Sequence, residues 1–329
     1  MSRFFDLLHR LKEEAGNRSL HSGGIASGDD QKAGFELDQT LSILLPQDPN
    51  HQETSDSGCA AGDKVSVLQE SGASHLKDFE TNAEFRKVLL EDVRTRVENR
   101  IVSKSDSKSP GADRFRFLRM RLQELSGATN LKKLLITSPL PEDGKSTVAL
   151  NLATSLAEGG KRSVLLIEAD LHRSPLIEQL GLSARPGLAE CLEDGANPIT
   201  SLRHLKSLGW YLLAAGAART NPTELLQGDA LSGVMDKLAP FFDWILIDSP
   251  PIIPLNDALS LRRHANASIL VVRAGRTPKE DVETASLLLE KQHLIGIVLN
   301  GVESLNAMYS RYSSYYGNGN GQATRPPRQ

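Results

Sequence analysis

The chain has 329 residues, of which 39% are hydrophobic, and its formal net charge is −3. This length and apolar content permit one large domain or two small ones, while the small net charge gives no bulk attraction to nucleic acid. The two cysteines, Cys59 and Cys191, show no metal-ligand spacing, and such sparse usage is typical of a reducing cytoplasm.

The N-terminal segment, residues 1–14, is predicted to form an amphipathic helix. Phe4, Phe5 and Leu8 alternate there with charged side chains. The pattern fits a packing helix as well as a docking helix. No apolar run approaches the roughly 20 residues that cross a bilayer, and the N-terminus lacks the apolar region of a signal peptide. We therefore expect any membrane association to come through a partner or a surface contact.

Residues 15–75 are interpreted as a mostly disordered linker. The segment is dense in Gly, Ser, Asp and Gln, and only the apolar patch at residues 41–45 interrupts it. Such a composition buries too little apolar surface to offset the entropy lost on ordering. The N-terminal region is therefore expected to be largely disordered, with helices at its two ends.

Residues 76–111 are predicted to hold a helix and a connector. Four apolar residues recur there at every fourth position, as expected for one face of a helix. The helix should end before the Ser-Pro-Gly sequence at residues 109–111, and a second helix should begin near Ala112. The four apolar residues are Phe85, Leu89, Val93 and Val97.

Short apolar runs alternate with helical segments beyond Leu131. The runs are nearly continuous in Ile, Val and Leu, which is typical of strands covered by helices on both faces. Residues 112–305 are therefore predicted to form a doubly wound α/β domain with a mostly parallel sheet, which binds ligands at the carboxyl ends of its strands. The predicted strands are residues 134–137, 164–167, 211–214, 244–247, 269–272 and 296–299.

A phosphate-binding loop is predicted at residues 138–147, Ser-Pro-Leu-Pro-Glu-Asp-Gly-Lys-Ser-Thr, between the first strand and a helix. Backbone N–H groups at the helix start would hold the β-phosphate, and Lys145 would reach the β and γ oxygens. The Ser146 hydroxyl would bind Mg²⁺. The generic pattern has glycine where Pro139 stands. The predicted nucleotide-binding residues of the loop are Asp143, Gly144, Lys145, Ser146 and Thr147.

Carboxylates follow two of the predicted strands. Glu168 and Asp170 stand two residues apart after one strand, and Asp248 ends another. Alternation at a strand end is expected to aim Glu168 and Asp170 the same way. An acid at such a place can also cap the following helix, but agreement with the phosphate-binding loop favours a nucleotide site. Asp248 would hold Mg²⁺ through water.

A tyrosine cluster lies in residues 306–329, which are predicted to form a flexible tail. Four of the five tyrosines of the chain fall there, among Gly and Ser and with almost no aliphatic neighbours. Phenols in such a setting are expected to be exposed. Together with a nucleotide site they indicate phosphoryl transfer to the chain itself. The four are Tyr309, Tyr312, Tyr315 and Tyr316.

Residues 112–316 together resemble the bacterial tyrosine kinases of capsule and exopolysaccharide synthesis, which have a P-loop ATPase scaffold related to MinD and ParA. The loop at 141–146 is similar to the family's Pro-Gly-Glu-Gly-Lys-Ser, with Glu142 in place of its glycine. The Ile-Asp-Ser-Pro-Pro sequence at 247–251, followed by Asp257, is similar to another family motif. Residues 221–226 and 271–277 also look like family signatures.

The resemblance implies ATP and Mg²⁺ as cofactors and assigns roles at the strand ends. Glu168, Asp170 and Arg173 match the family's Asp-x-Asp-x-x-Arg motif. The first acid is then expected to take the tyrosine proton and the second to organise Mg²⁺. Glutamate in the first place is one methylene longer, and a shift near ~1 Å can lower a rate ~100-fold. The predicted catalytic residues are Lys145, Glu168 and Asp170, and the predicted metal ligands are Ser146, Asp170 and Asp248.

A charged helix ahead of the sheet is similar to the Glu-x-x-Arg-x-x-Arg helix through which family members form rings. Asp113, Arg116 and Arg119 recur at three-residue spacing, which predicts one helical face. That face can be an oligomer interface or a solvated surface. The resemblance favours a ring, in which the tail of one subunit enters the site of its neighbour and leaves after phosphorylation.

The resemblance also implies partners and a location. It predicts a separate inner-membrane activator that controls polysaccharide chain length, a counteracting tyrosine phosphatase, and residence in the cytoplasm at the inner face of the plasma membrane. The leading hypothesis is an ATP-dependent protein-tyrosine autokinase. One alternative is an ATP-driven assembly switch of the polysaccharide machinery with weak or no kinase activity. A positioning ATPase like MinD or ParA is less favoured, because it leaves the tyrosine tail unexplained.

Overall fold

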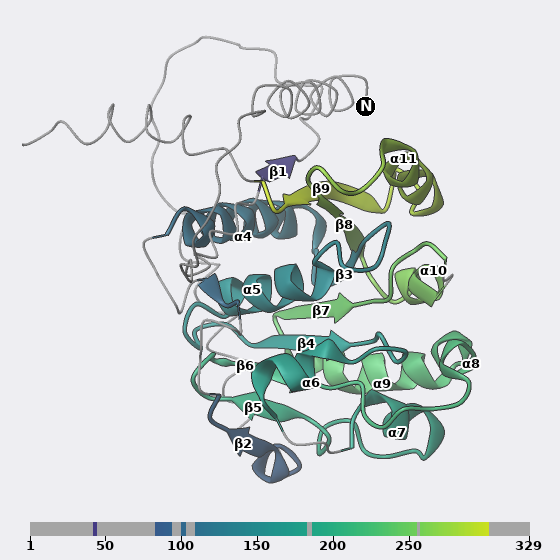
Figure 1. The fold of residues 1–329 in the computed structure, drawn as a ribbon. Helices are drawn as coiled ribbons and strands as arrows, with labels where there is room; N and C mark the ends of the chain where they lie inside the picture. The colour runs from purple at the N-terminus through teal and green to yellow at the C-terminus, as the bar shows by residue number, and fades with distance from the viewer. Residues whose placement is uncertain are drawn as a thin grey trace, which may run out of the picture.

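The computed structural model contains a sheet with helices packed on both of its faces (Figure 1). No helix within the described part of the chain is long and apolar enough to cross a membrane. The residues described are 83–93, 100–102, 109–182, 186–254 and 257–302, together with the backbone of Ser42–Leu44.

The sheet has nine strands in the order β1-β9-β8-β3-β7-β4-β6-β5-β2. Neighbouring strands are parallel except for two antiparallel pairs, β1 with β9 and β5 with β6. All six strands predicted from apolar runs are present, which confirms the mostly parallel α/β class. The strands are β1 Ser42–Leu44, β2 Leu89–Glu91, β3 Lys133–Thr137, β4 Val164–Glu168, β5 Arg203–Leu205, β6 Trp210–Leu213, β7 Trp244–Asp248, β8 Ala267–Arg273 and β9 Leu294–Asn300.

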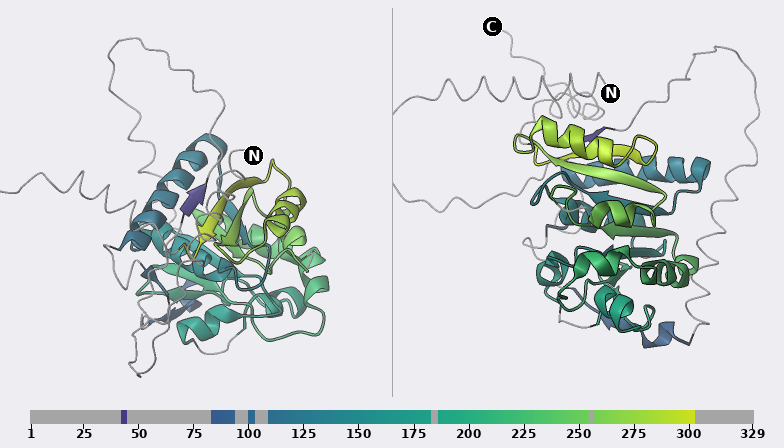
Figure 2. Two further views of the ribbon diagram at one scale, coloured as in Figure 1. Left: turned by 45° about the horizontal axis from the view of Figure 1, so that its top comes forward. Right: turned by 90° about the vertical axis from the view of Figure 1, so that its right-hand side faces the viewer.

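Two layers of helices cover the two faces of the sheet (Figure 2). Side chains of α4, α5 and α6 pack with Leu134 and Ile136 of β3, whereas α7 to α11 pack on the face of Leu135. Burial on both faces explains why these strands lack polar alternation. The helices are α4 Pro110–Thr129, α5 Lys145–Ala157, α6 Pro175–Leu180, α7 Leu188–Glu193, α8 Pro222–Gln227, α9 Ala230–Leu238, α10 Asp257–Arg262 and α11 Lys279–Leu288, with short 3-10 helices η1 Phe85–Lys87 and η3 Ala239–Phe241.

Helix α4 starts where the sequence places a helix-initiating signal. The Ser109 hydroxyl accepts a hydrogen bond from the Ala112 N–H at 3.2 Å, and Pro110 occupies the first turn, where its missing N–H leaves no bond unmade. The helix ends at Thr129, and the next residue, Asn130, takes a left-handed conformation with φ 54°. The predicted start near Ala112 was therefore late by two residues.

The predicted helix through Phe85 and Leu89 is wrong in its described part, since those residues lie in η1 and β2. Phe85 packs against Tyr211 and Phe241 with ring centroids 6.2 and 4.7 Å apart, and β2 extends the sheet beside β5. Strand pairing and aromatic burial outweigh the helical spacing here. Their partners lie more than 100 residues away in the sequence, so the local pattern could not reveal them.

Strand β1 lies inside the segment predicted to be a disordered linker and coincides with its apolar patch. It pairs antiparallel with β9, with Ser42 opposite Leu299 and Leu44 opposite Ile297. The remaining residues of that linker, the helix predicted at residues 1–14 and the tail at 306–329 all lie outside the described residues.

Candidate functional site

The predicted phosphate-binding loop and the predicted acids meet at one edge of the sheet. Strand β7 lies between β3 and β4, and in the two ladders Asp248 is paired with Ile136 on one side and with Glu168 on the other. The ends of three neighbouring parallel strands therefore deliver the loop, the Glu168 to Asp170 segment and Asp248 to the same place. This is the arrangement that the strand-end motifs predicted.

Gly144 gives the loop a backbone shape that other residues rarely adopt. Its φ is +98°, and a Cβ atom built there would lie 2.0 Å from Nδ2 of Asn300. That amide donates to the Asp143 carbonyl at 3.0 Å, so Asn300 at the end of β9 fastens the loop. The sequence predicted the strand ahead of Asn300 but gave this residue no role, because its partner lies 157 positions away.

Asp143 shapes the loop with its side chain. Its carboxylate accepts hydrogen bonds from the Leu140 N–H at 3.0 Å and from the Thr277 hydroxyl at 2.7 Å. Burial raises the pKa of Asp143, while these two hydrogen bonds act in the opposite direction. Asp143 is a predicted nucleotide-binding residue, but its side chain instead holds the shape of the loop. Thr147, another predicted nucleotide-binding residue, lies in the first turn of α5.

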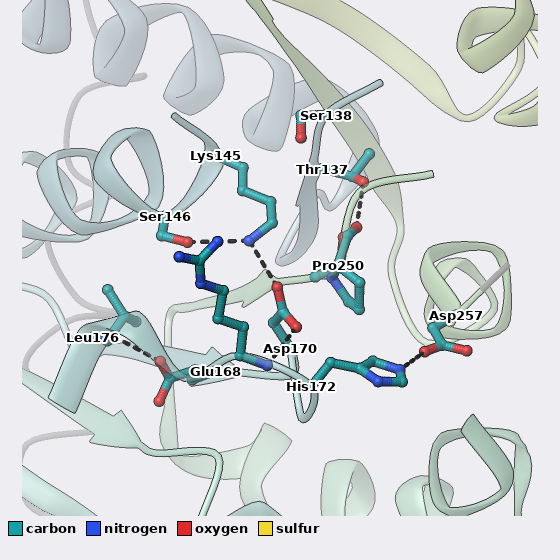
Figure 3. A network of polar contacts seen from close by, with 12 residues as sticks. Thr137, Ser138, Lys145, Ser146, Glu168, Asp170, His172, Leu176, Pro250 and Asp257 are labelled. Carbon is teal, nitrogen blue, oxygen red and sulfur yellow. Dashed lines mark hydrogen bonds and ion pairs between the residues drawn. The ribbon is translucent and has the colours of Figure 1, made fainter. Parts of the chain in front are cut away.

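Lys145 and Asp170 form a buried ion pair at the start of α5. The Lys145 ammonium donates to Asp170 Oδ2 at 3.0 Å and to the Ser146 hydroxyl at 3.3 Å (Figure 3). The Arg173 N–H donates to the other oxygen of Asp170 at 3.1 Å. Burial acts to lower the pKa of Lys145, but the charges of Asp248 and Asp170 outweigh it and raise that pKa. The lysine is therefore charged and directed at the predicted metal-binding acids.

Asp248 is buried with both carboxylate oxygens lacking a hydrogen-bond partner among the described residues. Burial raises its pKa, and the charge of Lys145 opposes that rise. An unsatisfied buried carboxylate is costly unless a cation or donor compensates it. The oxygens of Asp248, Asp170 and Ser146 are hard donors that suit Mg²⁺, which usually takes one or two carboxylates and completes its shell with water and phosphate.

Glu168 does not share the orientation of Asp170. Its two oxygens accept the N–H groups of Leu176 at 2.8 Å and Ala215 at 3.1 Å, and its side chain is fully buried. Figure 3 shows it directed at Leu176 while Asp170 faces Lys145. Burial raises the pKa of Glu168 to about 7, against the effect of those two hydrogen bonds. The expectation that both acids aim the same way is wrong, because Glu168 accepts backbone N–H groups of Leu176 and Ala215 whereas Asp170 accepts the Lys145 ammonium.

His172 and Asp257 form a second pair close to the site. The ring Nε2 lies 2.7 Å from Asp257 Oδ2, and the two residues lie to one side of Lys145 in Figure 3. Asp257 is buried, and its other oxygen has no hydrogen-bond partner in the part of the chain that the structure describes. The sequence indicated Asp257 through its motif, but the spacing gave no sign that His172 would meet it.

The predicted oligomer-interface residues on α4 separate into two groups. Asp113 and Arg116 form an exposed ion pair on the outer face. Arg119 instead turns toward α5, where it donates to the Ser155 carbonyl at 3.3 Å and lies 3.8 Å from Glu158. The predicted single face is thus wrong for Arg119, because three-residue steps drift around a helix of 3.6 residues per turn. The predicted phosphorylation sites, Tyr309, Tyr312, Tyr315 and Tyr316, lie outside the described residues.

Comparisons with known proteins place this geometry in a family, although no family model matches the chain. The tyrosine-protein kinase YwqD of Bacillus subtilis is 30% identical over 225 residues, which are 68% of this chain and 93% of that protein. The tyrosine-protein kinase ptk of Acinetobacter johnsonii is 32% identical over 187 residues, which are 56% of this chain and only 25% of that longer protein.

A solved structure of a tyrosine kinase domain has a fold similar to that of this chain. The kinase domain of the Escherichia coli tyrosine kinase ETK superposes with a TM-score of 0.59 at 26% identity, covering 63% of this chain and 82% of that one. The chain therefore belongs to the family of bacterial tyrosine-protein kinases.

Proposed function

We propose that this chain is an ATP-dependent protein-tyrosine autokinase that phosphorylates its own C-terminal tyrosines and regulates exopolysaccharide or capsule synthesis and export. The observation that supports it best is the unsatisfied Asp248 carboxylate beside the Lys145–Asp170 ion pair. A lysine at a helix start with two acids that can share a cation is a set of groups that P-loop proteins use to bind the phosphates of ATP together with Mg²⁺.

The chain's own groups would bind the nucleotide as follows. Backbone N–H groups at the start of α5 hold the β-phosphate, and Lys145 binds β and γ oxygens. Ser146, Asp170 and Asp248 would hold Mg²⁺, which neutralises charge on the phosphates when bound. Because Lys145 already contacts Asp170, binding of ATP exchanges part of this ion pair for contacts to phosphate.

In the proposed reaction a tail phenol oxygen attacks the γ-phosphorus in line. A new oxygen–phosphorus bond forms, the bond between the γ-phosphorus and the β,γ-bridging oxygen breaks, and ADP leaves. We assign the phenol proton to Glu168, because a pKa of about 7 suits an acceptor near neutral pH. Its oxygens must exchange backbone donors for the phenol, which requires a shift of the loop ahead of α6. Asp170 is the other candidate acceptor.

We further propose that transfer occurs between neighbouring subunits of a ring. The exposed Asp113–Arg116 pair supports this, and so do the adjacent side chains of Phe117 and Met120, each 52% exposed on α4. Large apolar side chains beside charged ones are common at protein interfaces. The proposed partners are a separate inner-membrane chain-length activator and a tyrosine phosphatase, with the chain at the inner face of the plasma membrane.

A second candidate is an ATP-driven assembly switch with weak or no kinase activity. The observation in its favour is Glu168, whose two oxygens are already committed to the Leu176 and Ala215 N–H groups. In that case the acid serves as a structural support and ATP binding controls assembly with the polysaccharide machinery.

One experiment separates the two functions. The purified full chain is incubated with Mg-ATP, with and without a membrane-activator fragment, and phosphotyrosine is measured together with ATP binding. We expect phosphotyrosine in the unaltered chain and none in Lys145→Met or in a variant with Phe at Tyr309, Tyr312, Tyr315 and Tyr316. ATP binding without phosphotyrosine under both conditions would contradict the kinase proposal and support the switch.

A further inference from the structure

An ion pair joins the phosphate-binding loop to the turn between β8 and α11. A guanidinium nitrogen of Arg276 lies 2.8 Å from a carboxylate oxygen of Glu142, and both side chains are more than half exposed. Glu142 stands where the resembled family motif has glycine, and its φ is +65°, in the left-handed region. The chain therefore keeps a glycine-like backbone here and adds a carboxylate beside the phosphate site.

Further hydrogen bonds join the turn that carries Arg276 to the phosphate-binding loop. The Thr277 hydroxyl donates to Asp143 at 2.7 Å and accepts the Arg273 N–H at 2.9 Å. The Ala274 N–H donates to the carbonyl of Asn300, whose side chain in turn holds the Asp143 carbonyl. Arg276 thus projects from a backbone that is fixed relative to the loop, which places its charge reproducibly beside Glu142.

The N-terminus of α5 and the carboxylate of Glu142 act in opposite directions on the phosphates of a nucleotide. A helix N-terminus attracts anions, but a carboxylate in the preceding loop repels them. The hydrogen bond and charge of Arg276 lower the pKa of Glu142, and Arg173 acts in the same direction. Glu142 is therefore ionised at neutral pH, and its repulsion of phosphate depends on how well Arg276 neutralises it.

We propose that Arg276 supports nucleotide binding by neutralising Glu142 beside the phosphate-binding loop, so that the phosphates of ATP can approach it. The inference rests on the proposed function, since it concerns the same nucleotide. Glu142 in turn holds Arg276 in place over the loop. The two residues act as a unit, and the loss of Arg276 is harmful mainly because it leaves Glu142 uncompensated.

A double-substitution experiment on the full chain tests this dependence. Dissociation constants for Mg-ATP and Mg-ADP are measured by calorimetry for the unaltered chain, Arg276→Gln, Glu142→Gln and the double variant. We expect Arg276→Gln to weaken ATP binding about 10-fold and ADP binding less, since the repulsion grows with phosphate charge. Glu142→Gln should bind ATP at least as tightly as the unaltered chain, and the double variant should return to within about 2-fold of it. Raising the salt concentration should shrink these differences.

The matched control is Arg121→Gln, which removes an arginine from another exposed ion pair, that with Glu124 on α4. It should leave ATP binding within about 2-fold of the unaltered chain, because it makes the same change in net charge far from the loop. Equal ATP binding by Arg276→Gln and the unaltered chain would overturn the inference alone. A double variant as weak as Arg276→Gln would overturn the neutralising role of Arg276. Failure of the unaltered chain to bind Mg-ATP would contradict the proposed function itself.

Discussion

The ammonium of Lys145 lies 3.0 Å from Asp170 Oδ2, so the lysine expected to bind phosphate is already paired with a carboxylate expected to bind magnesium. Both side chains are about nine-tenths buried, and such a pair is strong only while both partners are present. In the proposed function ATP would compete with Asp170 for Lys145, whereas Mg²⁺ would pair with Asp170 and leave Lys145 to the phosphates.

This competition predicts opposite effects of Asp170→Asn with and without metal. In the absence of Mg²⁺ the substitution should tighten ATP binding about 5-fold, because Lys145 no longer has to leave a carboxylate. With Mg²⁺ present, phosphotyrosine formation should fall about 100-fold, because a ligand of the metal is lost. Fluorescent-nucleotide titration in chelator and a phosphotyrosine time course measure the two effects.

The control for charge is Asp236→Asn, which removes an exposed acid on α9. It should change neither measurement by more than about 2-fold, since it lies outside the site. Weaker metal-free ATP binding in Asp170→Asn than in the unaltered chain would contradict the competition between Asp170 and phosphate for Lys145.

Glu168 is expected to support the fold whatever its part in the reaction. Glu168→Ala should lower the free energy of unfolding by about 2–4 kcal/mol, because the buried N–H groups of Leu176 and Ala215 lose their acceptors. Glu168→Gln keeps one good acceptor and should lower it by about 1 kcal/mol. Urea unfolding followed by the fluorescence of the buried Trp210 and Trp244 measures both. An alanine variant as stable as the unaltered chain would refute the supporting role.

The same glutamine variant separates support from proton transfer. If Glu168 accepts the phenol proton, Glu168→Gln should lose phosphotyrosine by ~100-fold or more while still binding ATP. Retained phosphotyrosine would leave Asp170 as the acceptor. Because glutamine changes stability little, a loss of activity in this variant is not explained by unfolding.

Residues close together in sequence made most of this site predictable. Strand β3, the loop and α5 are consecutive, and the acids directly follow apolar runs, so local pattern and parallel topology were enough to bring Lys145, Asp170 and Asp248 together. Side-chain direction was harder. Glu168 turned away from Lys145 because Leu176 and Ala215 offered it donors, and Ala215 is 47 positions away in the sequence.

Long-range partners explain the other differences between expectation and structure. Asn300 reaches a loop 157 positions earlier, and Arg276 reaches Glu142 across 134. Neither contact produces a pattern of neighbouring residues that could be recognised in the sequence. The helix predicted through Phe85 failed for the same reason, since β2 exists only by pairing with β5.

Asn300 is predicted to hold the phosphate-binding loop in its active shape. Asn300→Ala removes the donor to the Asp143 carbonyl and should weaken ATP binding about 10-fold while leaving the fold intact. Gly144→Ala should be more severe, because the added Cβ meets Asn300 and the backbone there has φ +98°. Calorimetric ATP titration measures both variants.

Asn266 supplies a matched control at the opposite end of the sheet. Its side-chain oxygen accepts the N–H groups of Lys132 and Lys133 at 3.1 and 2.7 Å, just before β3. Asn266→Ala should lower thermal stability without changing the affinity for ATP. If both asparagine variants weaken ATP binding equally, the effect of Asn300 is one of general stability, contrary to this prediction.

His204 is predicted to make the fold less stable in acid. Its ring stacks on Tyr211 with centroids 4.4 Å apart, and burial lowers its pKa below 6.5, with Lys206 adding to the effect. The unfolded chain then binds a proton more readily than the folded one, so stability is fully present above pH 6.5 and falls as the pH drops through the lowered pKa. His204→Phe keeps an aromatic ring on Tyr211 and removes this proton. Unfolding free energies from about pH 7.5 to about pH 5.5 should therefore decline less steeply in the variant.

His264, whose pKa burial also lowers, should account for part of the remaining slope, so His204→Phe with His264→Asn should flatten it further. An equal slope in His204→Phe and the unaltered chain would show that this ring is protonated as easily in the fold as outside it.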